Sequence, residues 1–460
     1  MTTKTNTLRS LLLLVVIWAM LPIRPSEGSP LTVYGFWPRD IAMSGAHIAT
    51  NPSLGAAFLN PGSAGHSEEQ RVGISFSAFT PQLFINRALP ICITDSRTCS
   101  QIYPGGYSQQ ANLIPENTVG LSIGWIKPLG GFFKKRFALS ATLYLPTKNI
   151  LKAEGVDSSV PHFVMYQSLT DKVALATALS WRPMDWISVG LGIQALADLD
   201  SDIAMDLDIL GNRFVKHDLT VSIKPKAALI AGLLARPRKN VSIGMTLRQK
   251  LPLVFRVPSV FTIGNTVQTD LYFEGIVLYS PSQFEVGFSY LIEQWGLELT
   301  FQANLAYWSG MRDLSPRIDI NFGGDLIDGL GAGETLDLRE TEKRPLLGFR
   351  DNWTLHGGFE WQVGNRIQIR GGGQYRPSPT AKMTGSKNLL DNDAWGLSAG
   401  IGIVVGDLWG IQRAPVHLDL GLTSLFLLRR TIQKGVGDLV GDLDHGGYIL
   451  GGALSLSHAY

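Results

Sequence analysis

From Arg71 onward, the chain is organised in segments of about ten residues in which apolar and polar residues alternate strictly. In the first segment, Val72, Ile74, Phe76 and Ala78 alternate with Arg71, Gly73, Ser75 and Ser77. The pattern recurs after Val119, Phe137, Ile187, Val241, Leu297 and Trp353. A period of two residues predicts β-strands with one apolar face. After residue 28, no apolar run reaches the roughly 17 to 25 residues that a membrane-spanning helix needs.

The connections between these segments alternate between short and long, which is typical of a transmembrane barrel. The short turns include Gly130-Gly131, Arg182 to Asp185 and Arg236 to Asn240, and we expect them on the periplasmic side. The long connections are predicted to be extracellular loops: 87 to 110, 147 to 171, 200 to 217, 256 to 268, 309 to 349, 377 to 393 and 428 to 445. A large soluble β-sandwich is the alternative, with its apolar faces turned inward.

A direct count gives about fifteen strands, whereas a barrel with both ends of the chain in the periplasm needs an even number. The segment Thr269 to Ile292 is therefore interpreted as one strand bent at Pro281, which leaves about fourteen. The last strand, Gly446 to Tyr460, ends on an aromatic residue, and this resembles the signal that the outer-membrane barrel assembly machinery recognises. The size, the terminal strand and the N-terminus favour a membrane barrel over the sandwich.

The N-terminus has the features of a secretory signal peptide. Lys4 and Arg9 precede an apolar run from Leu11 to Leu21, and small residues around Glu27 provide a cleavage site. A non-cleaved anchor is the alternative, although the run is short for one. We predict three regions: signal peptide 1–28, N-terminal hatch (plug) 29–70 and barrel 71–460. Residues 29–70 lack the alternation, and their small and turn-forming residues are compatible with a plug inside the barrel or with a periplasmic extension.

The composition agrees with a surface that partly faces lipid. Hydrophobic residues make up 45% of the chain and charged residues only 17%, below the roughly 25% of soluble domains. The formal net charge is +2, so nucleic acid is not an expected partner. Cys92 and Cys99 lie in a loop-like segment, and in an oxidising compartment they are predicted to form a disulfide. No histidine cluster accompanies them to indicate zinc.

Several short motifs resemble those of the FadL/TodX-type outer-membrane transporters of long-chain fatty acids and other hydrophobic compounds. They are Met43-Ser44-Gly45-Ala46, Phe58-Leu59-Asn60-Pro61-Gly62, Asn352-Trp353 with Gly358, Arg370-Gly371-Gly372, Tyr375, Ser378-Pro379 and Leu390-Asp391-Asn392-Asp393. Gly62 stands where the family usually has Ala. The resemblance implies a fourteen-stranded all-β barrel closed by a hatch, and passive uptake with lateral release into the membrane. It implies a fatty acid or another hydrophobic small molecule as the partner, with membrane lipid and lipopolysaccharide around the barrel.

The candidate site residues fall into two groups. Gly45, Asn60, Pro61 and Gly62 are candidates for gating, because small residues and a tight turn allow a hatch to pack closely. A plain loop before the first strand is the alternative. The second group lies at positions predicted to face inward: Glu298, Glu360, Arg366 and Arg370. These charges are expected to pair with one another, while Arg370 is also a candidate for binding a substrate carboxylate.

Two further motifs carry little weight. The acidic run from Asp198 to Asp208 offers oxygen ligands but lacks the glycine and final glutamate of a calcium loop, so no metal site is predicted. The glycine-rich stretch 329–333 lacks the setting of a nucleotide loop. Since no catalytic motif is found, we expect neither an enzyme nor a cofactor. A barrel that serves as an assembly or secretion partner remains the alternative function.

Overall fold

The structure is a computed structural model, which describes Gly35 and residues 37–88, 114–133, 135–148, 157–166, 172–208, 213–263, 267–323, 344–380, 383, 387–406, 415–434 and 441–460. The predicted signal peptide, both cysteines and the glycine-rich stretch 329–333 lie outside these residues. Within them, no helix combines the length and the apolar character needed to cross a membrane.

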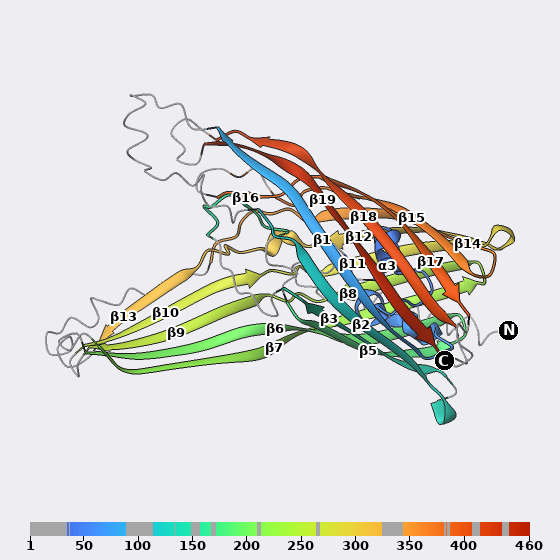
Figure 1. Cartoon of the computed structure of the whole chain (residues 1–460), viewed down its shortest axis with the longest axis horizontal. Helices are drawn as coiled ribbons and strands as arrows, with labels where there is room; N and C mark the ends of the chain where they lie inside the picture. Colours follow the sequence, from blue (N-terminus) through green and yellow to red (C-terminus); the bar gives the residue numbers. More distant parts are fainter. Residues whose placement is uncertain are drawn as a thin grey trace, which may run out of the picture.

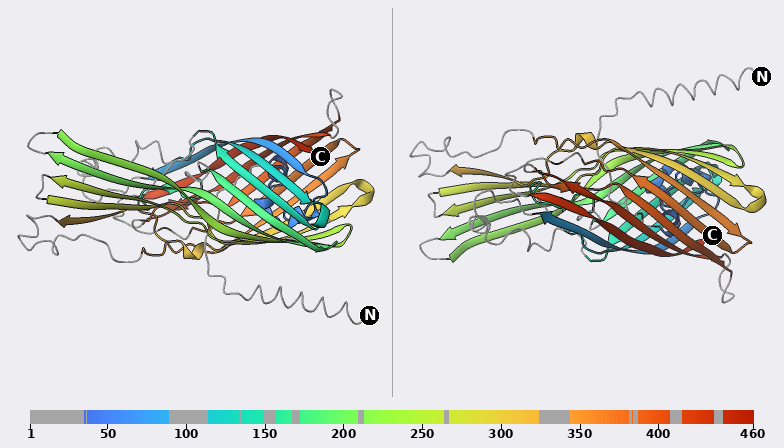
Figure 2. Two further views of the ribbon diagram at one scale, coloured as in Figure 1. Left: turned by 90° about the horizontal axis from the view of Figure 1, so that it is seen from below. Right: turned by 90° about the horizontal axis from the view of Figure 1, so that it is seen from above.

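Fourteen antiparallel strands form a closed ring, as the alternation predicted. Each pairs with the next, and the first pairs with the last along its whole length, from Arg71↔Ala459 to Ala88↔Asp442. Figures 1 and 2 show the ring from three sides. Its strands are β1 (Arg71–Ala88), β2 (Thr118–Leu129), β3 (Phe137–Pro146), β5 (Ala174–Met184), β6 (Ile187–Asp208), β7 (Arg213–Arg238), β8 (Val241–Arg248), β11 (Gln283–Ile292), β12 (Leu297–Ala306), β14 (Asn352–Val363), β15 (Ile367–Arg376), β17 (Ala394–Val405), β18 (Val416–Ile432) and β19 (Asp442–Ala459).

Three further strands of the same sheet lie outside the ring: β9 (Leu253–Ile263), β10 (Val267–Leu278) and β13 (Arg317–Gly323). They correct two sequence-based predictions. The segment Thr269 to Ile292 is not one bent strand, because β10 pairs with β9 and β13 whereas β11 pairs with β8 and β12. The ladder changes partners around Pro281, whose nitrogen has no proton to donate. Residues 200–217 and 256–268, predicted as loops, belong largely to strands β6, β7, β9 and β10.

The two ends of the barrel differ. At the turn end, where β1 begins and β19 ends, short turns join the strands (Figure 1). At the opposite, loop end, the barrel divides into two arms that separate in Figure 1. The short arm continues β1, β18 and β19. The long arm continues β6 and β7, and it adds β9 in parallel beside β6, followed by β10 and β13.

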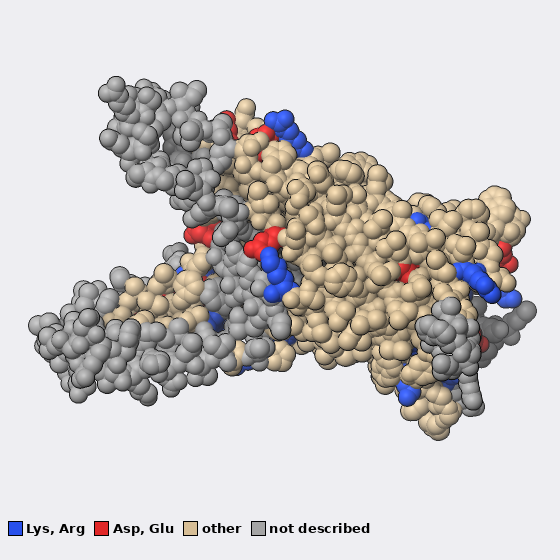
Figure 3. All heavy atoms as spheres, in the orientation of Figure 1, with Lys and Arg blue, Asp and Glu red and all other residues tan. Residues whose placement is uncertain are grey.

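The outer wall of the ring is apolar, as the alternation requires. The outward side chains of Phe76, Leu191 and Leu397 are 50%, 58% and 62% exposed, while their neighbours along the strands, such as Ser75 and Ser77, are buried. Charged side chains gather toward the two ends, and few lie on the middle of the visible wall (Figure 3). A continuous apolar belt of this kind exceeds what a soluble monomer exposes to water, and it fits a lipid environment.

Candidate functional site

Residues 37–67, here called the inner segment, lie inside the ring (Figures 1 and 2). They contain the helices α3 (Pro38–Ala42) and α4 (Ala56–Leu59) and the 3-10 helix η1 (Pro61–His66). Helix α3 contacts β15, β17, β18 and β19, whereas α4 and η1 contact β3, β5 and β6 on the other side of the ring. The inner segment therefore crosses the lumen from wall to wall.

Gly45 occupies a turn that only glycine fits easily. Its φ is +82°, and Ser44 before it also has a positive φ of 49°. A Cβ at Gly45 would lie 3.2 Å from Nδ1 of His356 on β14. The same Nδ1 atom lies 2.6 Å from the carbonyl oxygen of Ser44, so the turn is bonded to the wall. A side chain at position 45 would meet both backbone strain and a tight contact.

Asn60, Pro61 and Gly62 hold the far end of the inner segment against the wall. The amide of Asn60 donates to the carbonyl of Ile48 at 2.7 Å and to that of Leu233 on β7 at 3.0 Å, and its oxygen accepts from the Gly62 nitrogen at 3.0 Å. The carbonyls of Pro61 and Gly62 accept hydrogen bonds from the hydroxyls of two inward serines on the wall. These are Ser180, at 2.5 Å, and Ser188, at 2.6 Å.

Glycines on the wall make this close approach possible. A Cβ at Gly190 of β6 would lie 2.4 Å from the carbonyl carbon of Pro61, and one at Gly232 of β7 would lie 2.2 Å from Oδ1 of Asn60. A Cβ at Gly62 itself would lie 2.8 Å from the carbonyl oxygen of Gly232. Backbone packs on backbone here, and any larger residue would force the two apart.

Three of the four predicted inward charges meet around Arg39 of α3. Glu360 accepts from Arg39 Nε at 2.8 Å and from Arg370 Nε at 2.6 Å, and Glu298 lies 4.0 Å from Arg39. Arg370 also donates to Asp419 at 2.5 Å and to the amide oxygen of Gln368. Since protein acceptors engage Nε and both terminal nitrogens of Arg370, its charge is already compensated. The network ties α3 to β12, β14, β15 and β18.

Arg366, the fourth predicted inward charge, does not face the lumen. It lies exposed in the turn between β14 and β15, because β14 ends at Val363 and Gly364 turns the chain with a φ of +62°. The sequence analysis also missed Arg248, which is buried on β8. Its guanidinium pairs with Glu285 at 3.0 Å and donates to the carbonyl of Phe58 at 2.8 Å. It also lies over the aromatic ring of Phe58, 4.4 Å from the ring centre.

Two buried groups of the inner segment have displaced pKa values. Burial raises the pKa of Asp40 to about 7, although Arg39 and the hydroxyl of Ser53 act in the opposite direction. Burial, with His356 and Arg39 nearby, lowers the pKa of His47 to about 3. Oδ1 of Asp40 lies 3.9 Å from Nδ1 of His47, and neither atom has a hydrogen-bond partner among the described residues. Near neutral pH this histidine is uncharged, and Asp40 is close to its midpoint.

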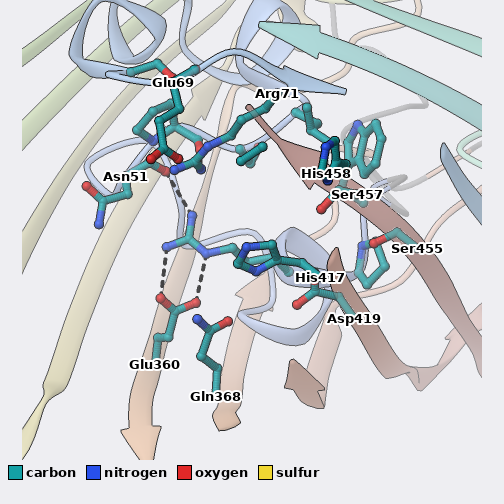
Figure 4. A pocket seen from close by; sticks show the side chains of 18 of the residues that line it. Asn51, Glu69, Arg71, Glu360, Gln368, His417, Asp419, Ser455, Ser457 and His458 are labelled. Atoms are coloured by element: carbon teal, nitrogen blue, oxygen red, sulfur yellow. Dashed lines mark hydrogen bonds and ion pairs between the residues drawn. The ribbon is translucent and has the colours of Figure 1, made fainter. Parts of the chain in front are cut away.

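A polar cavity of about 490 Å³ lies between the inner segment and the turn end of the ring (Figure 4). Arg71 and His458 come from the first and last strands, and His417 and Asp419 come from β18. Asn51 of the inner segment closes another side, where it accepts a hydrogen bond from Arg236 at 2.7 Å. Most of the remaining lining is polar or charged: Arg39, Ser53, His66, Ser67, Glu68, Glu69, Glu360, Gln368, Arg370, Ser455 and Ser457.

The loop side of the inner segment is apolar instead. Ile41 of α3 belongs to a cluster of buried side chains that extends to the mouth of the barrel. The cluster combines inward residues of the wall with residues of segments that fold in from the loop end. Its larger members are Phe79, Leu83, Phe163, Met165, Tyr166, Ile276, Tyr279, Trp308, Met311, Leu347, Phe349, Met383, Leu389, Leu390, Leu425, Leu427, Ile432, Leu443 and Ile449.

Two short strands, β4 (His162–Phe163) and β16 (Leu389–Leu390), pair in parallel beneath this mouth. The residues that follow β16 fasten them to the wall. Asp391 forms two hydrogen bonds of 2.9 Å with Arg376, which also donates to the hydroxyl of Tyr166 at 2.6 Å. Asn392 donates to the carbonyl of Leu428 at 2.7 Å. The motif at positions 390–393 therefore anchors these short strands to the wall beside the apolar cluster.

The described residues contain no group of three or more His, Cys, Asp or Glu side chains arranged to hold a metal ion. The acidic run from Asp198 to Asp208 forms the outer part of β6, so it lies on a strand and not in a loop.

Comparisons with known proteins agree with this architecture. No protein-family model matches the sequence. Alkane uptake protein A of Marinobacter nauticus is 23% identical over 426 residues, which cover 87% of this chain and 84% of that protein. A Pseudomonas aeruginosa FadL homologue has a TM-score of 0.57 and 14% identity, with 95% of this chain and 99% of that chain covered. The P. putida toluene transporter TodX has a TM-score of 0.53 and 11% identity, with 93% and 99% covered.

The likeness to the solved structures extends over nearly the whole of both chains, although few residues are identical. This likeness is in the closed barrel that surrounds the inner segment. The resemblance seen in the sequence motifs is confirmed at the level of the fold, and the chain has the architecture of the FadL-type transporters of hydrophobic compounds.

Proposed function

We propose that the protein is an outer-membrane channel for the passive uptake of long-chain fatty acids or other hydrophobic molecules. The observation that carries this proposal is the contrast across the inner segment. On its loop side lies a buried apolar cluster, and on its turn side lies a cavity lined mainly by charged and polar groups. In this proposal the loop end is extracellular, the turn end is periplasmic, and the inner segment is the hatch between them.

An apolar molecule gains free energy in the apolar cluster, at roughly 25 cal/mol for each Å² of its surface removed from water. It gains no comparable free energy in the polar cavity, where it would separate charged groups from water and from each other. We therefore propose that cargo leaves sideways through the barrel wall into the membrane. The wall beside α4 fits this route, because the inward residues of β5 there are the small residues Ala174, Ala176 and Ala178.

The hatch is held at two places, and we propose that both must yield for transport. One is the charge network that links Arg39 to Glu360, and the other is the backbone contact of Pro61 and Gly62 with the glycines of β6 and β7. Gly45 and Asn60 fix the turns that direct the chain to these contacts. Passive exchange between seated and displaced hatch needs no chemical energy source.

The names of the relatives support uptake over the alternative of an assembly or secretion partner, since they refer to an alkane uptake protein and a toluene transporter. We also propose that the protein resides in the outer membrane, which the apolar belt and the export signal that the sequence predicts support. Fractionation of cells that express the full precursor tests this. We expect a mature chain that begins near Ser29, in the outer-membrane fraction, with heat-modifiable mobility.

Transport is tested with purified protein in lipid vesicles. Labelled fatty acid and labelled alkane are offered outside, and uptake is compared with that of vesicles without protein. We expect faster uptake of both apolar compounds and no uptake of a sugar of similar length. A variant without residues 29–70 is expected to fold, because β1 and β19 close the ring without them, and to admit the sugar. Equal uptake with and without protein would refute the proposed function.

A further inference from the structure

The sheet of the long arm has one apolar and one charged face. Strands β9, β10 and β13 pair in register, so each rung of three residues lies on a single face. One face carries the rung Val257, Phe273, Ile318 and the rung Ser259, Leu271, Ile320. The other face carries the rung Arg256, Glu274, Arg317 and the rung Pro258, Tyr272, Asp319.

The contacts of these residues agree with this division. On the charged face, Glu274 pairs with Arg256 at 3.1 Å and with Arg344 at 3.5 Å. On the apolar face, the side chain of Ile318 is 55% exposed, as much as the lipid-facing residues of the ring. Opposite charges across a rung stabilise a sheet, but they do not hide an apolar face from water.

The apolar face points outward. In the ring, Leu191 and Ile193 of β6 are exposed on the outer wall, so the odd-numbered positions of this strand face outward. Strand β9 pairs with β6 in register at Ile203↔Ser259. The rung of Ser259, Leu271 and Ile320 therefore lies on the side of the sheet that continues the outer wall, where Leu271 and Ile320 are partly exposed and the small Ser259 is buried. The charged rungs lie on the lumen side.

The long arm reaches beyond the height of a bilayer. Strand β5 accompanies β6 only as far as Leu196, and β6 continues from Ala197 to Asp208, which is twelve residues. At a rise of about 3.3 Å per residue these residues extend about 40 Å past the ring. A transmembrane strand needs about 9 to 11 residues, so the 22 residues of β6 are twice that number.

We propose that the outer face of the long arm is a docking surface for a condensed apolar phase, such as droplets of liquid hydrocarbon, from which the channel collects its cargo. We choose an apolar phase as the occupant because the apolar face of the arm is continuous with the lipid-facing wall of the ring. The strands β6 and β7 run from the ring into the arm without interruption, so the sheet that faces lipid in the ring is continuous with the sheet of the arm. Membrane hydrocarbon does not extend to this height.

This inference rests on the proposed uptake function, and two separate measurements test them. The protein in lipid nanodiscs is mixed with an emulsion of hexadecane, and the fraction that floats with the droplets is measured. The variant Leu271→Asn with Ile318→Asn changes two rungs of the apolar face. Val260→Asn, an apolar residue of β9 on the opposite face, is the matched control. Heat-modifiable mobility shows that each barrel is folded.

We expect wild type and Val260→Asn to float with the droplets, and the double variant to lose at least tenfold in apparent affinity, because two apolar contacts are replaced by hydrated amides. Flotation of the double variant equal to wild type would overturn the inference. Wild type that floats no better than empty nanodiscs would do the same. A change in oligomeric state together with unchanged flotation would assign this face to contacts between copies of the chain and would also overturn it.

The second measurement is uptake of fatty acid delivered as single molecules from cyclodextrin. The double variant should keep the wild-type rate, because this cargo needs no droplet contact. If wild type fails this uptake, the proposed function fails, whatever the flotation shows. If wild type passes it and only the double variant loses flotation, both the function and the inference hold.

Discussion

Replacing Glu360 by Gln removes the carboxylate that joins the inner segment to the wall. Glu360 accepts from Arg39 at 2.8 and 3.3 Å and from Arg370 at 2.6 Å. Arg370 keeps Asp419, whereas the only carboxylate in ion-pair distance that Arg39 keeps among the described residues is Glu298, at 4.0 Å, beside the neutral acceptors Thr50 and the Asn51 carbonyl. Removing one partner of a buried ion pair costs about 3 to 5 kcal/mol, because the remaining charge is left uncompensated.

The lower value applies here, since the side chains of Arg39 and Glu360 remain 15% and 16% exposed. A loss of about 3 kcal/mol shifts the balance between seated and displaced hatch by about 150-fold. Single-channel recording in planar bilayers measures this balance as the frequency of openings, which we expect to rise by about that factor. Glu293→Gln, at an exposed turn, is the matched control and should leave the recordings unchanged.

The double variant Arg39→Met with Glu360→Met separates the charge effect from lost packing. It removes both members of the pair, so no uncompensated charge stays buried on the inner segment, and openings should fall back toward the wild-type frequency. The reasoning is refuted if Glu360→Gln opens no more often than wild type, or if the double variant opens as often as the single one.

Three other perturbations test separate parts of the site. When the hatch is seated, Asp40 holds a proton up to about pH 7, so its contribution to seating is fully present below about pH 4 and is lost as the pH rises to 7. Over that range the wild-type channel should open more often relative to the variant Asp40→Asn. Parallel pH profiles of the two proteins would contradict this. The variant Gly232→Val should displace the hatch and raise the permeability of vesicles to sugar, because a Cβ at position 232 would lie 2.2 Å from Asn60 Oδ1. The control variant Gly130→Val should not, because a Cβ at position 130 has nothing within 4 Å. Equal permeability of the two variants would count against close packing as the cause. Thiol labelling without reductant should leave Cys92 and Cys99 unmodified, and labelling of both would disprove the predicted disulfide.

The alternation of residues was sufficient to predict the ring, because a strand that separates lipid from lumen needs an apolar residue at every second position. It was not sufficient to define the long arm. Strands β9 and β10 alternate as well as any ring strand, and nothing within a single segment states which neighbour it pairs with. Pro281 marked the right place, but it marks a change of partner and not a bend.

The candidate site could be predicted where its residues lie on strands, because the alternation along a strand decides whether a side chain faces the lumen or the lipid. Glu298, Glu360 and Arg370 lie on strands, and their positions indicated that they face inward. Arg366 was placed wrongly, because its position relative to the strand end depends on the turn at Gly364. Arg39 precedes the first strand, in a segment without alternation, so the sequence does not indicate where its side chain points. Its role in the charge network depends on how the inner segment crosses the lumen.

The seam between the two ends of the chain determines the order of assembly. Gln70 and Tyr460 exchange backbone hydrogen bonds of 3.1 and 2.9 Å, and above them β1 and β19 pair over eighteen residues. The contacts that close the cylinder are thus the most distant in sequence, so the entropy of loop closure opposes them more than any other strand pairing, and we expect them to form last. The inner segment is joined directly to β1. We therefore expect the barrel to enclose the inner segment while β1 pairs with β19. The hatch is then incorporated during closure and is not inserted into a finished pore.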